Sequence, residues 1–207
     1  MGVQLQARCF IVRFEDGSLW LHSPAPPDAR LKSEIDALGE VRWLVLPNKW
    51  HHLGATESVK AWPTAQLVVA PSLVQRRPDL RPDHVLGRGA DALWPEMAAL
   101  PLAGVPYLDE TCFFHHPTGT LIAADLLIRA SDHDHWSLRA VGRVAGIRDQ
   151  PGPPPDVRLS ALDQERCRDS VARLLELPIV RICASHMEPV QDNPKAVLAE
   201  AWGLSVS

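Results

Sequence analysis

Short, continuous apolar runs recur along the chain, and they predict buried β-strands. Each run is rich in valine, isoleucine, leucine or alanine and has the length of a strand that is covered on both faces. Runs at residues 41–46, 120–124 and 179–184 each lead into a polar cluster. Two more runs lie at residues 67–70 and 97–102. The chain therefore carries at least five candidate core strands.

Turn residues and helical spacing fill most of the intervals between these strands. Asp16-Gly17 separates two β-rich segments and predicts an opening hairpin, and Pro117-Thr118-Gly119 predicts another. Ser160 is expected to begin a long helix, in a capping-box pattern with Asp163. Apolar stripes predict helices at residues 31–38, 160–175 and 194–204. Another helix is predicted at residues 54–62, which Pro63 would end. The order predicts a layered α/β domain, with one mixed sheet or two sheets covered by helices.

Residues 126–159 show no clear periodicity. Their only strong local signal is Pro151-Gly152-Pro153-Pro154-Pro155, which predicts a stiff loop. The length of this segment and its weak periodicity are compatible with a lid over a cleft.

Composition narrows the class of protein. A chain of 207 residues fits a single domain spanning residues 1–207. The formal net charge is −4, and no basic stripe or block of like charges occurs, which argues against nucleic-acid or membrane-surface binding. We expect a small-molecule substrate or ligand as the partner. No window approaches about 18 apolar residues, so no transmembrane helix is expected.

The four cysteines and the N-terminus indicate a compartment. Cys9, Cys112, Cys167 and Cys183 show no CxxC spacing, which predicts buried free thiols and a reducing, cytoplasmic environment. Residues 1–10 lack the basic region and apolar stretch of a signal peptide.

Polar clusters directly follow three of the predicted strands. His51 and His52 follow the strand at 41–46, Asp125 follows 120–124, and His186 follows 179–184. In layered α/β folds, strand C-termini gather on one rim, where sites form. Three imidazoles and one carboxylate suit a divalent metal, so His51, His52, Asp125 and His186 are predicted ligands.

Simpler interpretations stay open beside the metal site. Adjacent histidines occur by chance, and a strand-terminal aspartate often caps a helix, so a degenerate site without metal is the alternative. His115 and His116 are neighbours on a strand and point to opposite faces, which favours a structural role for one of them. His133 and His135 favour a surface loop over a pocket.

The order of these features resembles the metallo-β-lactamase superfamily. That superfamily has an αββα sandwich fold and an H-x-H-x-D-H motif between a strand and a helix, where this chain has Pro47-Asn48-Lys49-Trp50-His51-His52. Aligning the final histidine with His52 puts His51 at the aspartate position, with Pro47 and Lys49 at the first two histidines. Asp125 matches the bridging carboxylate and His186 the last histidine, whereas residues 102–110 lack the intermediate histidine.

Several segments also resemble an uncharacterised branch of that superfamily, the DUF4336-like proteins. These segments are distributed over most of the chain, at residues 16–24, 46–52, 113–117 and 195–202. This likeness implies the four-layer αββα fold far more than any particular reaction.

The resemblance implies one metal site rather than two. All three site-one histidines are replaced, whereas His51, His52, Asp125 and His186 remain as one ligand set. Zinc is the first choice of metal, with iron or manganese as alternatives, and zinc can lower the pKa of a bound water to about 7. The implied activity is hydrolysis of an ester, lactone, thioester or phosphoester, with Asp125 or a nearby histidine helping to move a proton.

Lys49 has a separate expected role, because it falls where a site-one ligand would be. Its ammonium is expected to take the place of the missing cation and to bind an anionic substrate group or polarise a carbonyl. Two other functions stay open: a non-catalytic relative that binds a small anion or a protein partner, and a mononuclear iron redox protein.

Overall fold

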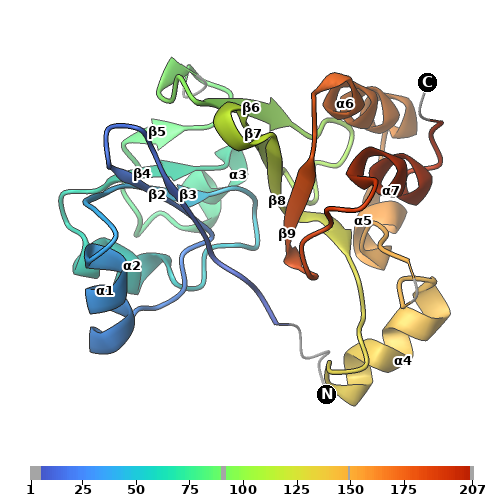
Figure 1. Ribbon diagram of the computed structural model, residues 1–207, viewed down its shortest axis with the longest axis horizontal. Coiled ribbons are helices and arrows are strands. Elements are labelled where there is room, and N and C mark those ends of the chain that lie inside the picture. Colours follow the sequence, from blue (N-terminus) through green and yellow to red (C-terminus); the bar gives the residue numbers. More distant parts are fainter. Residues whose placement is uncertain (1–5, 90–91, 149, 206–207) are drawn as a thin grey trace. The chain divides into compact units, whose positions relative to one another are not determined.

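The computed structural model describes residues 6–89, 92–148 and 150–205 of the chain (Figure 1). The N-terminal residues 1–5, part of the segment assessed for a signal peptide, lie outside the described residues. The chain divides into two compact units, Cys9–Glu96 and Met97–Ser207, and the latter also includes the N-terminal segment through Arg8.

The unit Cys9–Glu96 is built on a five-stranded sheet in the order β1-β2-β3-β4-β5. β1 and β2 form the predicted antiparallel hairpin, and the other neighbours are parallel. The strands are β1 (Phe10–Arg13), β2 (Leu19–His22), β3 (Val41–Leu46), β4 (Gln66–Val69) and β5 (His84–Val85). The parallel pairs put the C-terminal ends of β2, β3 and β4 at the same edge of this sheet.

Alternate residues of these strands face opposite sides of the sheet, and both sides are buried. Leu19, Leu44 and Leu67 lie on the face that packs against the helices, in a core cluster that also includes Ile35 and Leu73. The helices are α1 (Ala29–Asp36), α2 (Ala55–Ala61) and α3 (Pro71–Arg76). Near-continuous apolar strands are what a parallel sheet covered on both faces requires.

Tryptophans fill the other face of the same sheet. The ring of Trp94 meets Trp20 and Trp43 edge to face, with centroid separations of 5.9 and 5.5 Å. All three rings are nine-tenths or more buried. Edge-to-face contacts add to the stabilisation that burial of the rings already provides, so these tryptophans are packing residues.

The unit Met97–Ser207 is built on a four-stranded sheet in the order β6-β7-β8-β9. β6, β7 and β8 pair antiparallel, and β8 pairs with β9 in parallel. The strands are β6 (Met97–Pro101), β7 (Thr111–His115), β8 (Thr120–Ile128) and β9 (Arg181–His186). A 3₁₀ turn, His116–Thr118, joins β7 to β8 where the sequence predicts a hairpin.

Four α-helices among the described residues complete this unit. They are α4 (Trp136–Ala145), α5 (Pro155–Ser160), α6 (Gln164–Glu176) and α7 (Pro194–Ala201). α6 and α7 lie side by side (Figure 1) and bury Val171 and Leu198. None of the helices in the described residues has the length and apolar character needed to cross a membrane.

Register changes abruptly in the middle of β8. Ala123 pairs with Ala184, but the next paired residue is Ile128, opposite His186. Between these two pairs β8 advances by five residues while β9 advances by two, so residues 124–127 leave the regular ladder. Bulges of this kind often re-aim a side chain beside a functional site.

Two sequence expectations in this unit need correction. Ser160 does not begin the long helix: it ends α5, and α6 follows Asp163, whose side chain accepts a hydrogen bond from the backbone N–H of Arg166. Leu162 intervenes with a hydrogen bond to Gly104, which separates the two helices. The loop predicted at residues 151–155 ends earlier than expected, because Pro155 begins α5. Within the rest of residues 126–159, which show no clear periodicity in sequence, the chain completes β8 and forms α4.

The cysteines form no disulfide, as the sequence predicts. Cys112 and Cys167 are buried, and Cys9 and Cys183 are partly buried. Burial raises the pKa of Cys9 to about 11 and that of Cys112 well above its ordinary value. Thiols of this kind are poor nucleophiles at neutral pH.

We predict that Gly54→Ala destabilises the unit Cys9–Glu96. A Cβ at Gly54 would lie 2.2 Å from the backbone oxygen of Pro24, so the segment after β2 would have to move away from the start of α2. The expected loss in unfolding free energy is about 1–3 kcal/mol or more, measured by denaturant titration. Leu53→Ala is the control: Leu53 is 84% exposed, and its loss should change stability by less than about 0.5 kcal/mol. Equal stability of the two variants would contradict the tight contact.

Candidate metal centre

The loop after β3 is held by the buried side chain of Asn48. Its Oδ1 accepts hydrogen bonds from the backbone N–H groups of Trp50 and His51, at 2.8 and 2.9 Å. Such a side-chain turn fixes the backbone directly after the strand. The sequence Asn48-Lys49-Trp50-His51-His52 is therefore an ordered loop that presents its side chains in defined directions.

Ser23 orients the ring of His51 within this unit. The Nδ1 atom of His51 lies 2.9 Å from Oγ of Ser23, which in turn lies 3.2 Å from Nδ1 of the buried His22. Ser23 adopts the left-handed conformation, with φ 52°, a strained choice that often marks a functional position. With Nδ1 occupied, Nε2 is the atom that His51 can offer to a metal.

His52 has a different partner. Nη1 of Arg77 lies 2.9 Å from Nδ1 of His52, and Nη2 of Arg77 donates to Thr56 and Asp79. Arginine only donates hydrogen bonds, so Nδ1 of His52 must accept and the neutral ring carries its proton on Nε2. Burial and then the charges of Arg77 and Arg76 lower the pKa of His52 below its ordinary value of 6.5.

Two cationic side chains, Lys49 of the same loop and Arg76 of α3, lie near the ring of Trp50. The guanidinium carbon of Arg76 lies 4.3 Å from the ring centroid, and the Lys49 ammonium lies 5.8 Å from it. Both distances are within the range of cation–π attraction. Lys49 is partly buried and Arg76 exposed, so this loop presents positive charge together with its histidines.

In the other unit, Asp125 lies within the bulge of β8 and is buried. The backbone N–H groups of Ala124 and Asp125 point to the carboxylate of Glu110, which accepts them at 2.7 Å and at 2.9 and 3.2 Å. Glu110 is 1% exposed. A buried carboxylate thus accepts the hydrogen bonds from these two bulged residues and fixes the backbone at Asp125.

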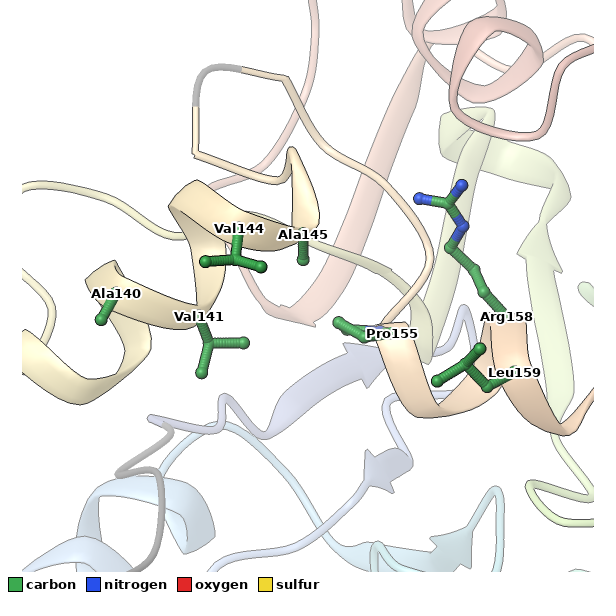
Figure 2. Close-up of a pocket in the computed structure, with 7 residues that line it drawn as sticks. All are labelled: Ala140, Val141, Val144, Ala145, Pro155, Arg158 and Leu159. Atoms are coloured by element: carbon green, nitrogen blue, oxygen red, sulfur yellow. The ribbon is translucent and has the colours of Figure 1, made fainter.

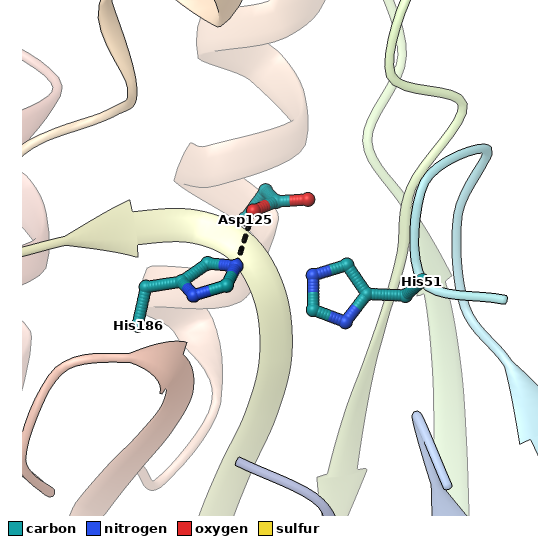
Figure 3. Close-up of side chains that lie close together, drawn as sticks. All are labelled: His51, Asp125 and His186. Carbon is teal, nitrogen blue, oxygen red and sulfur yellow. Dashed lines mark ion pairs between the residues drawn. The ribbon is translucent and has the colours of Figure 1, made fainter. Parts of the chain in front are cut away.

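His186 ends β9 beside Asp125 (Figure 3). Its Nε2 atom lies 3.1 Å from Oδ1 of Asp125, and its Nδ1 atom lies 2.6 Å from the carbonyl oxygen of Gln6. Both side chains are buried. A carbonyl only accepts hydrogen bonds, so Nδ1 must carry a proton.

This tautomer decides what the Asp125–His186 pair requires. In neutral His186 the Nε2 lone pair faces a carboxylate oxygen, and two acceptors at 3.1 Å repel each other. Either a second proton or a cation must lie between them. Metal-ligating histidines commonly donate the non-ligating N–H to a backbone carbonyl, as His186 does to Gln6.

The predicted site residues thus fall into two groups. Within one unit the structure brings Asp125 and His186 together, and within the other it places Lys49, His51 and His52 on one loop. The rings of His51 and His52 have different partners, so the two adjacent histidines are not equivalent.

The remaining histidines have local roles. His115 ends β7 and is buried, with Nδ1 at 2.8 Å from Oγ1 of Thr118. His116 is exposed, but it lies in the 3₁₀ turn and not on the strand that the sequence predicts for both histidines. His135 caps α4 by accepting the N–H of Ser137, and His133 is exposed. These contacts agree with structural roles.

Sequence reasoning missed Glu110, Ser23 and Gln6. Glu110 directly precedes the apolar segment that forms β7, and its only sequence signal is a charge beside a buried strand. Ser23 directly follows β2, at the same edge of the sheet as the loop after β3. Gln6 acts through its backbone, which leaves no trace in residue type.

Comparisons with solved structures identify the fold. A chemotaxis sensor ODP, described as a peroxy diiron species, is 12% identical with a TM-score of 0.66, covering 97% of this chain and 88% of that one. A metallo-β-lactamase from Pontibacter korlensis is 17% identical with a TM-score of 0.62, covering 96% and 86%. The Flv1 flavodiiron core from Synechocystis sp. PCC6803 is 11% identical with a TM-score of 0.63, covering 95% of this chain and 52% of that one.

The chain has the metallo-β-lactamase fold. Its two sheets and the seven α-helices of the described residues match structures of that fold, which confirms the predicted αββα class. No family model matches the sequence, and no curated protein matches it either. Identities this low establish the fold and leave the activity to the chemistry of the site.

We predict that Glu110→Ala is strongly destabilising because it leaves the buried N–H groups of Ala124 and Asp125 without their acceptor. The expected loss in unfolding free energy is about 2–5 kcal/mol, from roughly 1–3 kcal/mol for each unsatisfied group. Glu110→Gln retains one oxygen and should lose less. Denaturant unfolding measures both variants, with Glu188→Ala as the control, since its exposed ion pair to Arg8 contributes little. A Glu110→Ala variant as stable as the control would show that the bulge does not need the carboxylate.

Proposed function

We propose that this chain binds one divalent metal ion through His51, Asp125 and His186 and hydrolyses a small ester, lactone, thioester or phosphoester. The observation that carries the proposal is the buried contact between Nε2 of His186 and Oδ1 of Asp125. Because Nδ1 of His186 is committed to the Gln6 carbonyl, a cation between the two side chains satisfies both.

Burial and charge around Asp125 support a cation there. Asp125 and Glu110 are both buried, and they are joined through the backbone N–H of Asp125. Two carboxylates with little access to water are costly unless hydrogen bonds or a cation compensate them. Glu110 accepts backbone hydrogen bonds, and Oδ1 of Asp125 lies beside Nε2 of His186. A divalent ion bound by both side chains would compensate the buried carboxylate.

His51 is the third ligand in this proposal. Ser23 holds its Nδ1, which orients the ring and directs coordination to Nε2. His51 lies on the loop that follows β3, Asp125 lies in the bulge of β8, and His186 ends β9. Loops and strand ends of this kind are where α/β folds gather their sites. Neutral imidazoles and a carboxylate suit zinc, iron or manganese, and zinc stays the first choice.

His52 is left outside the ligand set. Its Nδ1 accepts from Arg77, so Nε2 carries the proton and has no lone pair for a metal. A three-residue set also leaves coordination positions open, which a catalytic metal requires and a closed four-ligand zinc site lacks. The Arg77 contact therefore favours the open arrangement.

The reaction divides among the metal and the protein side chains. A divalent ion held by His51, Asp125 and His186 would supply Lewis acidity and would lower the pKa of a coordinated water. Asp125 has a second carboxylate oxygen directed away from His186 (Figure 3), which is suited to hold a proton during turnover. Lys49 is suited to attract an anionic group of the substrate, and Arg76 adds positive charge beside the same Trp50 ring.

A redox function is the second candidate, favoured by two similar structures whose descriptions name diiron species or a flavodiiron core. The same three side chains accept iron as well as zinc. The non-catalytic alternative is a protein that uses the site to bind a small anion. Membership of the DUF4336-like branch, a cytoplasmic location and a small-molecule partner belong to the proposal, and the free thiols agree with a reducing compartment.

Metal content tests the ligand set. We predict about one equivalent of metal per chain in protein purified without added metal, measured by elemental analysis. His51→Ala, Asp125→Ala and His186→Ala should each lose most of it, because each removes one of only three ligands. His52→Ala should keep it, and so should His116→Ala, the exposed-histidine control. Far-ultraviolet circular dichroism confirms that each variant is folded.

The identity of the metal separates the candidate functions. Zinc or manganese with hydrolysis of an ester, lactone, thioester or phosphoester supports the hydrolase, iron supports the redox candidate, and a folded protein without metal supports the binding role. Metal retained by folded Asp125→Ala and His186→Ala would reject this site. Metal lost only in His52→Ala would show that His52 is a ligand and would reject its exclusion from the ligand set.

Lys49 is predicted to act on substrate rather than on metal. Lys49→Met should raise KM for an anionic substrate about tenfold to a hundredfold, the effect of losing one charge-assisted contact. Metal content should not change, and a neutral substrate of the same reaction should be hydrolysed as before. Steady-state kinetics with matched anionic and neutral esters measures the difference. Loss of metal in Lys49→Met, or equal loss for both substrates, would contradict this role.

A further inference from the structure

An apolar groove lies between α4 and α5 within the unit Met97–Ser207 (Figure 2). Its volume is about 620 Å³. Small-molecule sites typically occupy about 300–1,000 Å³ and are mostly apolar with a few polar groups. The lining residues are Ala140, Val141, Val144, Ala145, Pro155, Arg158 and Leu159.

The apolar side chains of this groove are not needed for the core. α4 already buries Leu138 and Gly142, and Leu138 packs in a small cluster with Ala130 and Ile147. Val144 is nevertheless 91% exposed and Leu159, on α5, is 88% exposed. Two facing helices that both direct aliphatic side chains into one open groove form a contiguous apolar surface, which commonly marks a binding site.

Arg158 gives the groove its polarity. It is the one charged side chain among the residues that line it, and it forms no ion pair with any residue that the structure describes. A guanidinium beside an apolar wall complements a ligand that combines an aliphatic body with one anionic group. No carboxylate lines the groove to favour a cationic ligand.

Backbone contacts fix both helices beside the end of β8. Ile128 and Gly152 exchange hydrogen bonds of 2.8 and 3.0 Å, and the N–H of Ala130 donates to Ile147 at 2.8 Å. The segments entering α4 and leading to α5 are thus joined to the same strand. The two walls of the groove are held by hydrogen bonds rather than by the exposed side chains that line it.

We propose that this groove binds an aliphatic chain that carries one anionic headgroup, such as a medium-chain fatty carboxylate. The aliphatic chain would lie against Val141, Val144 and Leu159, and its carboxylate would pair with Arg158. This binding does not depend on the proposed metal or on hydrolysis.

Decanoate is the probe, used below its micelle concentration and titrated into the full chain by isothermal calorimetry. We expect one molecule per chain with a dissociation constant below about 1 mM. Val144→Asp and Leu159→Asp should each weaken binding at least tenfold, because they place a carboxylate in the groove. Both positions are so exposed that the substitutions should leave the fold intact. Arg158→Gln should weaken decanoate binding about tenfold.

Matched controls separate the groove from other sites. Leu162→Asp changes a side chain that is 82% exposed and does not line the groove, and Arg143→Gln changes an exposed arginine of α4 outside it. Both should bind decanoate as the unaltered protein does. Because a carboxylate also binds metals, the titration is repeated with Asp125→Ala, which should keep its affinity. That arm distinguishes failure of the groove from failure of the metal proposal.

Four outcomes would overturn the inference. They are no decanoate binding, unchanged binding in both Val144→Asp and Leu159→Asp, equal binding of decanoate and decyltrimethylammonium, and loss of binding in Asp125→Ala alone. Sedimentation equilibrium and vesicle binding address the other occupants. Self-association that is lost in Leu159→Asp, in a protein that does not bind decanoate, would assign the groove to a second copy of the chain. Binding to phosphatidylglycerol vesicles that is lost in Leu159→Asp, again without decanoate binding, would assign it to a membrane surface.

Discussion

The hydrogen bonds from the backbone of Ala124 and Asp125 to the buried carboxylate of Glu110 are the interaction on which the candidate centre depends. β8 leaves its ladder with β9 after Ala123 and rejoins it at Ile128, so the intervening N–H groups need acceptors that a neighbouring strand does not supply. Glu110 provides them. A regular strand would instead have carried the residues after Ala123 along the ladder with β9. The bulge places Asp125 against His186 but takes backbone N–H groups out of the strand ladder. Hydrogen bonds to Glu110 offset the cost of burying these groups.

A hydrogen bond to the backbone also fixes the side chain of His186. Its Nδ1 donates to a main-chain carbonyl, at Gln6, which lies far away in sequence but in the same unit. This contact chooses the tautomer, and the tautomer makes the nearby carboxylate repulsive unless a proton or a cation intervenes. Ser23 orients the ring of His51 through Nδ1, whereas Arg77 makes Nδ1 of His52 the acceptor, because an arginine only donates. Second contacts of the rings, more than their positions in sequence, decide which histidines can ligate.

Sequence patterning predicted the features that depend on burial. The strands at 41–46 and 120–124, the opening hairpin and most helices follow from apolar runs and turn residues, and the likeness in motif order led to the right fold class. Sequence patterning gave the wrong helix start, and it missed Glu110, where a single side-chain contact determines the structure. Ser160 has a capping residue's chemistry, but Asp163 makes the hydrogen bond that starts α6. Glu110 could not be found, because the bulge that it stabilises is set by pairing between β8 and a strand more than 50 residues later.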